Sequence, residues 1–182
     1  MHLRPLVLIA CTLAPLSTNA DQTDVRLDEL FSILKQTNNP AVIRGTENRI
    51  WEAWLEHDNS DVERLMSLAT QRMNTQRYPE AMLAFNQIVE NFPNYAEAWN
   101  KRATLNYLLG NTDESIADIE RTLELEPRHF GALSGLGLVY IQRKQLSKAK
   151  EAFEDLIEVH PNSPNAKQNL DLVIEQLRFG VI

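Results

Sequence analysis

Apolar residues recur along much of this chain at intervals of three and four positions, the spacing that gathers them on one face of an α-helix. The first such stripe falls within 24–36 and comprises Leu27, Leu30, Phe31 and Leu34. The turn signal Asn38-Asn39-Pro40 separates it from a second stripe that continues to His57. These two segments are therefore predicted to form a pair of amphipathic helices.

A last stripe begins after Ser163-Pro164, where the serine is a favoured helix N-cap and the proline a favoured first helical residue. Its apolar members are Ala166, Leu170, Val173, Ile174 and Leu177. We expect a single helix here that covers the exposed side of the unit before it.

The region between these stripes carries an internal repeat. Pro93, Pro127 and Pro161 are spaced by 34 residues, and reading back 31 residues from each gives the segments 62–95, 96–129 and 130–163. The segments align with Leu65, Trp99 and Leu133 at position 4, Ala69, Ala103 and Gly137 at position 8, Ala81, Ser115 and Ala149 at position 20, and Phe85, Ile119 and Phe153 at position 24. Small residues let two helices approach closely, large apolar residues fill the space between units, and each proline ends a second helix. Each segment is predicted to be a helix–turn–helix unit.

This pattern resembles the tetratricopeptide repeat (TPR). The resemblance implies an all-α fold, a TPR-type helix-turn-helix superhelical array (α-solenoid) with terminal capping helices. The expected organisation is 1–20 as a signal peptide, 21–61 as a degenerate TPR-like helical pair at the N-terminal end of the array, 62–95, 96–129 and 130–163 as three TPR units, and 164–182 as a C-terminal capping helix. Arg72 and Asn106 depart from the family pattern, because both stand at its aromatic position.

Composition narrows the classes of partner. Eighteen Lys and Arg against 25 Asp and Glu give a formal net charge of −7, the wrong sign for tracking a phosphate backbone. We therefore expect no nucleic-acid partner. No apolar run reaches the roughly 20 residues that are needed to span a bilayer.

The first twenty residues differ from the rest. A short basic start precedes an apolar stretch at 6–16, and small or polar residues then lead to Ala20. This order is typical of a secretory signal, so we expect cleavage after Ala20 and a periplasmic mature chain. As an alternative, 8–11 resembles a lipobox, in which case a lipidated Cys11 would anchor the protein to a membrane.

Catalysis needs convergent polar groups, and we identify no such set, so we expect no catalytic residue, no metal, no cofactor and no enzyme activity. His57, His129 and His160 each stand in or next to a predicted turn between helices. Because no cysteine or carboxylate completes a ligand set at a useful spacing, His129 and His160 are predicted to be solvated loop imidazoles rather than a shared metal site.

In the TPR family the first helix of each unit lines a concave surface that faces the ligand. The resemblance assigns to this groove Met66, Thr70, Met73, Asn100, Lys101, Thr104, Tyr107, Ser134, Leu138 and Ile141. Methionine and tyrosine are adaptable contact residues, which favours an extended or helical segment of another protein over a small-molecule substrate.

The family's pattern of Lys and Asn for holding chaperone C-termini is not matched. The corresponding positions carry Met66, Thr70, Lys101, Gly131 and Gly135. Gly131 and Gly135 are not required for helix pairing, so each either leaves room for a ligand backbone or makes a tight contact with the preceding unit. The groove itself is either open to a partner or partly filled by the chain's own terminal helices.

Four positive charges, Arg143, Lys144, Lys148 and Lys150, surround the predicted turn of the third unit. A charge run of this kind is usually a solvated face, and we expect that here rather than a docking patch.

These observations predict a non-catalytic protein–protein interaction scaffold of the bacterial cell envelope, which supports envelope assembly or integrity. The leader and a resemblance to small exported TPR proteins of Gram-negative bacteria carry that expectation. The alternative is a lipid-anchored structural component of an outer-membrane assembly machine, with membrane contact only through Cys11.

Overall fold

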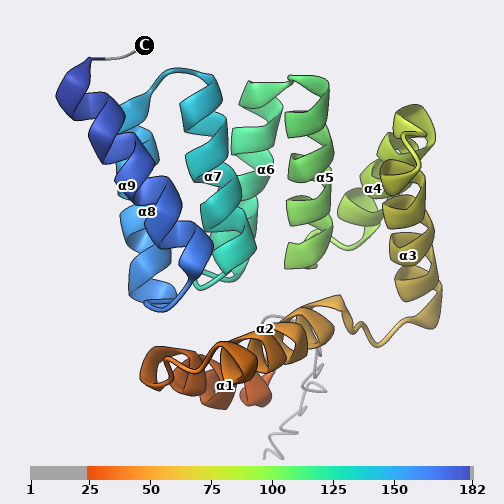
Figure 1. The fold of residues 1–182 in the computed structure, drawn as a ribbon. Helices are drawn as coiled ribbons and strands as arrows, with labels where there is room; N and C mark the ends of the chain where they lie inside the picture. Colours follow the sequence, from red (N-terminus) through yellow and green to blue (C-terminus); the bar gives the residue numbers. More distant parts are fainter. Residues whose placement is uncertain (1–23, 181–182) are drawn as a thin grey trace, which may run out of the picture.

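The computed structural model describes residues 24–180, and every regular element in that range is an α-helix (Figure 1). In chain order the helices are α1 (Val25–Gln36), α2 (Pro40–Leu55), α3 (Ser60–Asn74), α4 (Tyr78–Asn91), α5 (Ala96–Leu109), α6 (Thr112–Leu125), α7 (Phe130–Gln142), α8 (Leu146–Val159) and α9 (Pro164–Phe179). The expected all-α helical array is confirmed. The predicted leader at 1–20, with Cys11, lies outside the described residues. Among the described helices, none has the length and apolar character needed to cross a membrane.

Three helix pairs form the array. Helix α3 packs against α4, α5 against α6 and α7 against α8, and the pairs meet through α4–α5 and α6–α7 (Figure 1). Helix α9 packs along α8 and covers the last pair. It begins after Ser163, whose hydroxyl accepts a hydrogen bond from the Ala166 amide, so the N-cap signal in the sequence is confirmed.

The small residues of the repeat let the paired helices approach. Ala69, Ala103 and Gly137 are all buried. A Cβ atom at Gly137 would collide with the ring of Phe153 on the facing helix. In the second pair the buried Ser115 hydroxyl donates a 2.9 Å hydrogen bond to the carbonyl of Ala103, so a polar side chain is satisfied at this close approach.

The turn inside each helix pair has one residue in the left-handed conformation. These residues are Gln76, Gly110 and Lys144, with φ of 60°, 80° and 57°, and they are again spaced by 34. Glycine adopts this conformation without a steric penalty, whereas a residue with a Cβ atom loses about 1–2 kcal/mol there. Only the second unit shows this turn geometry in its sequence, because only there is the residue a glycine.

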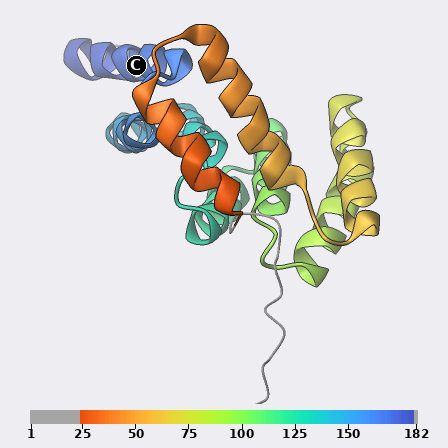
Figure 2. The ribbon, with the colours of Figure 1, turned by 90° about the horizontal axis from the view of Figure 1, so that it is seen from below.

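The N-terminal pair α1–α2 does not stack on α3 as one more unit, which differs from the expectation. It lies beneath the N-terminal ends of α5 and α7 (Figures 1 and 2). Its apolar side shares one core with α7, α8 and α9, to which the pair contributes Leu27, Leu30, Phe31, Leu34, Ile43, Ile50, Ala53 and Trp54. The pair therefore buries its two stripes against the far end of the array rather than against its neighbour in the sequence.

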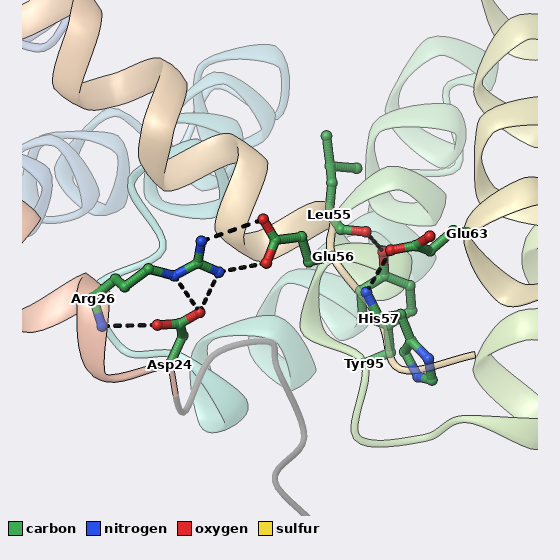
Figure 3. A network of polar contacts seen from close by, with 7 residues as sticks. All are labelled: Asp24, Arg26, Leu55, Glu56, His57, Glu63 and Tyr95. Atoms are coloured by element: carbon green, nitrogen blue, oxygen red, sulfur yellow. Dashed lines mark hydrogen bonds and ion pairs between the residues drawn. The ribbon is translucent and has the colours of Figure 1, made fainter. Parts of the chain in front are cut away.

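Polar contacts hold the segment that joins α2 to α3, as Figure 3 shows. The Tyr95 hydroxyl donates a 2.9 Å hydrogen bond to the carbonyl of Leu55 at the end of α2. The backbone amide of His57 donates to a carboxylate oxygen of Glu63 on α3, also at 2.9 Å. The connection is thus fixed to both the first and the second unit.

A second group of contacts joins the two ends of the α1–α2 hairpin (Figure 3). The Arg26 guanidinium bonds the carboxylates of Asp24 and Glu56 at the same time. The hydrogen bond from Arg26 holds the pKa of Asp24 below its ordinary value. The hairpin therefore has its own internal closure in addition to its apolar core.

We predict that Gln76→Gly raises the free energy of unfolding by about 0.5–1 kcal/mol, because glycine relieves the left-handed strain in the first turn. The matched control is Gln87→Gly, an exposed site inside α4, where glycine should lower stability by about 1 kcal/mol. Urea unfolding followed by circular dichroism measures both. Equal destabilisation by the two glycines would contradict the assignment of strain to this turn.

Candidate partner-binding groove

The first helices of the second and third units, α5 and α7, enclose a hollow of about 270 Å³. Its lining consists of Asn100, Ala103, Thr104, Tyr107, Leu108, Ser115, Ile119, Gly131, Ser134, Gly135, Leu138 and Val139. Most of this surface is apolar, with a few hydroxyl and amide groups. Because the hollow is smaller than the roughly 300–1,000 Å³ of a site for a drug-sized ligand, it suits one or two side chains of a partner.

Five of the ten residues assigned to the groove line this hollow together. They are Asn100, Thr104, Tyr107, Ser134 and Leu138. They come from two helices that the chain places 30 or more residues apart, and the array brings them to one face. These residues define the candidate binding surface, which we call the α5–α7 hollow.

The other five assigned residues lie elsewhere. Met66 and Met73 are buried in the core that α3 forms with α4 and α5, so the prediction that these two side chains face a partner is wrong. Thr70 lies on α3 and does not line the hollow. Lys101 points to Glu97 and the Trp51 ring, and Ile141 lines a separate cavity at the α7–α8 turn.

The two open alternatives for the α7 glycines resolve differently at the two sites. A Cβ atom on Gly131 would lie 2.5 Å from Cη2 of Trp51, so this glycine is required by a tight contact, made with α2 rather than with the preceding unit. A Cβ atom on Gly135 would lie 3.6 Å from Ile119 Cδ1, which is ordinary contact. Gly135 therefore has no packing reason, and the space beside it is part of the hollow.

Helix α2 closes one end of the groove. The Trp54 ring stacks on the His129 ring, with centroids 4.0 Å apart and planes at 10°. Trp51 meets the rings of Trp54 and Phe130 edge-on, and the Lys101 ammonium lies 5.2 Å from its centroid. The chain's own N-terminal hairpin thus fills the part of the groove next to the N-terminal ends of α5 and α7.

A buried polar network supports this contact. Glu97, on the first turn of α5, is 1% exposed. It accepts hydrogen bonds from Asn100 Nδ2 at 2.8 Å and His129 Nε2 at 3.0 Å, and Lys101 Nζ lies 2.9 Å from its other oxygen. His129 Nδ1 accepts from the Ala132 amide as the N-cap of α7, so the geometry assigns the tautomer with hydrogen on Nε2.

Two opposing effects act on the pKa of Glu97. Burial raises it, but the Lys101 charge together with the hydrogen bond and charge of His129 lowers it further, so the net shift is below the ordinary value of 4.5. The ionised carboxylate is therefore the native form at neutral pH. It orients the His129 ring on which Trp54 stacks.

The prediction that His129 and His160 are solvated is wrong, since both are 1% exposed or less. His160 Nε2 lies 2.8 Å from Glu47 of α2, so each histidine joins the array to the hairpin. No local signal reveals this, because the carboxylate partners lie 32 and 113 residues away in the sequence. Within residues 24–180 no group of three His, Cys, Asp or Glu could hold a metal ion.

We predict opposite effects for alanine at the two α7 glycines. Gly131→Ala should lower the free energy of unfolding by about 1–3 kcal/mol, because the new methyl group displaces Trp51, and it should change tryptophan fluorescence. Gly135→Ala should raise stability by up to about 1 kcal/mol through helix propensity. Guanidinium unfolding followed by fluorescence measures both, and equal effects would contradict the tight contact at Gly131.

We also predict that Glu97→Gln lowers the free energy of unfolding by about 1–3 kcal/mol at pH 7. A lowered native pKa stabilises the fold above the unfolded pKa of 4.5, and this stabilisation is lost as pH falls through the native pKa. The difference from the unmodified protein should therefore shrink below pH 4.5. Denaturant titrations at a series of pH values test this, with the exposed Glu120→Gln as the control. A difference that stayed constant with pH would exclude the network as its source.

Comparisons with known proteins agree with this architecture. Models of the tetratricopeptide repeat match residues 66–121 and 107–170. A TPR repeat-containing protein of Rhizobium etli is 34% identical over 152 residues, which cover 84% of this chain and 74% of that protein.

Two solved structures show the same fold. The first TPR domain of Spaghetti (RPAP3), bound to an HSP90 peptide, has a TM-score of 0.63 and 20% identity, and the match covers 66% of this chain and 96% of that one. The Yersinia enterocolitica type III secretion chaperone SycD, in complex with a peptide of the translocator YopD, has a TM-score of 0.62 and 14% identity, with 66% and 97% covered. With the repeat models and the bacterial relative, these likenesses establish that the chain belongs to the tetratricopeptide repeat family.

Proposed function

We propose that this protein is a non-catalytic interaction scaffold of the bacterial cell envelope and binds a segment of a partner protein in the α5–α7 hollow. The TPR fold supports an interaction role, since both solved neighbours carry a peptide. The observation that carries the proposal is Gly135, a glycine inside a helix that no packing contact requires and that leaves the hollow open. Glycine there costs the helix about 1 kcal/mol relative to alanine.

The shape of the hollow favours one apolar side chain of the partner as its occupant. Ala103, Ile119 and Val139 are the buried apolar residues of its lining. Thr104 and Tyr107 are more accessible and offer hydroxyl groups to the backbone of a bound segment. A charged small molecule would have no counter-charge here, because none of the lining residues is ionic.

Capture of a chaperone C-terminus is a poorer fit to this groove. Of the residues at the family's clamp positions, Met66 is buried, Gly131 lies against Trp51, and Lys101 is already paired with Glu97. No free cation therefore faces the α5–α7 hollow, and a carboxylate-rich ligand would gain no ion pair there.

The non-catalytic part of the proposal rests on how the buried titratable groups are used. Glu97 and His129 bond each other, His129 also caps α7, and His160 bonds Glu47. Each is held in the contact between the hairpin and the array, away from the α5–α7 hollow. These groups therefore serve the structure rather than a reacting substrate.

The envelope location rests on the leader pattern at 1–20. Intact-mass measurement of the mature protein from a Gram-negative host tests it. A chain that begins at Asp21 supports a periplasmic protein, whereas an acylated chain that begins at Cys11 supports the lipid-anchored alternative. An unprocessed chain beginning at Met1 would contradict both.

Photo-crosslinking tests the binding site. With a photoreactive residue in place of Tyr107, we expect one discrete adduct in cells, identified by mass spectrometry, and none from the same residue at Leu83, which is 71% exposed on α4. Adding Gly135→Leu, which fills the hollow, should remove at least nine-tenths of the Tyr107 adduct while circular dichroism stays unchanged. An adduct that persists with Gly135→Leu would place the partner outside the α5–α7 hollow.

A further inference from the structure

A second cavity, of about 440 Å³, lies between the α7–α8 turn and the C-terminal part of α9. Its lining consists of Ile141, Lys144, Gln145, Leu146, Ser147, Lys148, Gln176 and Leu177. Three of these residues are apolar, two are cationic and none is acidic. We call this site the turn cavity, and it is separate from the α5–α7 hollow, with which it shares no lining residue.

The apolar part of the turn cavity is well supported. Ile141 and Leu146 pack against the core that the hairpin shares with α7, α8 and α9. Leu177 is 41% exposed, so apolar surface remains uncovered on the α9 side. A partner side chain placed here would bury apolar surface against a rigid floor.

The four cations around the turn divide into two classes. Arg143 bonds Asp113, and Lys150 lies 2.6 Å from Glu154, so these two charges are compensated within the chain. Among residues 24–180 no carboxylate pairs with Lys144 or Lys148, and the Lys148 ammonium lies 5.4 Å from the Tyr140 ring. Both uncompensated cations line the cavity.

The start of α8 adds to this positive potential. Its first turn contains Leu146, Ser147 and Lys148, and its N-cap Gln145 makes no side-chain cap hydrogen bond. Helices α4, α5 and α6 also lack such a bond, but each carries an acidic residue in its first turn, and α8 carries none. The positive end of the α8 dipole is thus uncompensated at the cavity.

We propose that the turn cavity is a second docking surface, which takes a short acidic segment of a partner protein with one apolar side chain between its carboxylates. The apolar side chain would pack on Ile141, Leu146 and Leu177, and the carboxylates would reach Lys144 and Lys148. Charge complementarity selects this occupant, because the two lysines stand on the rim of an apolar floor in a chain of net charge −7. A free phosphate would use the lysines but not the floor.

Selection from a phage-displayed library of random 12-residue peptides tests the proposal on the full chain. Binders are selected on the unmodified protein after depletion on Lys144→Glu/Lys148→Glu. We expect the enriched peptides to share at least two Asp or Glu within three positions of one apolar residue. Enrichment of peptides without acidic residues, or no enrichment at all, would overturn the proposal.

The best peptide is then measured by fluorescence anisotropy. Lys144→Glu/Lys148→Glu and Leu177→Asp should each weaken binding at least tenfold, and raising the salt from 50 to 500 mM should weaken it further. Lys35→Glu, an exposed lysine on α1, and Leu172→Asp, an exposed leucine of α9 outside the cavity, are the matched controls and should change affinity less than twofold.

Two further measurements separate this proposal from other occupants. Gly135→Leu should leave the affinity unchanged, and a loss with that variant would move the peptide to the α5–α7 hollow and overturn the turn cavity as its site. Sedimentation of the unmodified protein should show no self-association that Lys144→Glu/Lys148→Glu removes. Self-association of that kind would make a second copy the occupant and would equally overturn the proposal.

Discussion

The contact between α2 and the N-terminal ends of α5 and α7 is the interaction on which the rest of this structure depends. Trp54 is almost fully buried where it stacks on His129, and the hydrogen bond to Glu97 orients that ring. Large aromatic rings contribute much of the apolar area in such contacts. Because the contact joins a segment near residue 50 to one near residue 130, it turns a linear array into a structure closed by long-range packing. In a simple repeat array each unit contacts only its neighbours.

The same contact decides which part of the concave face remains for a partner. Trp51 takes the space beside Gly131, one turn of α7 before Gly135, where the hollow stays open. Two glycines on one helix therefore have different uses, since one receives the chain's own helix and the other leaves room for a ligand. A scaffold built this way offers a short site with a defined end rather than a continuous groove.

Ion pairing within the chain distributes the positive charges unevenly. Lys101 is held by the buried Glu97, and Arg128 bonds Glu126 and Asp28, which raise the pKa of its guanidinium against the effect of burial. These cations stabilise the contacts among the repeats and the hairpin. Lys144 and Lys148 have no such carboxylate among the described residues, and an acidic protein thereby keeps a small positive site beside an apolar floor.

The sequence by itself determined the helices, the 34-residue repeat and the family, because those features depend on local periodicity and on small residues at fixed positions. Asn100, Thr104, Tyr107, Ser134 and Leu138 were also found from the repeat register, since the register places them on the inner face of the array. The burial of Met66 and Met73 was not, because register alone does not show how closely the next helix packs.

Tertiary structure alone decided where the N-terminal pair lies, and with it the roles of His129, His160 and Gly131. The apolar stripes of α1 and α2 show that the pair must be covered, but many surfaces satisfy that requirement equally well in sequence terms. The choice depends on shape and charge complementarity between segments more than 70 residues apart: a glycine that admits Trp51, an imidazole that stacks on Trp54, and a carboxylate at Glu47 that reaches His160. Complementarity of this kind exists only once the array has folded.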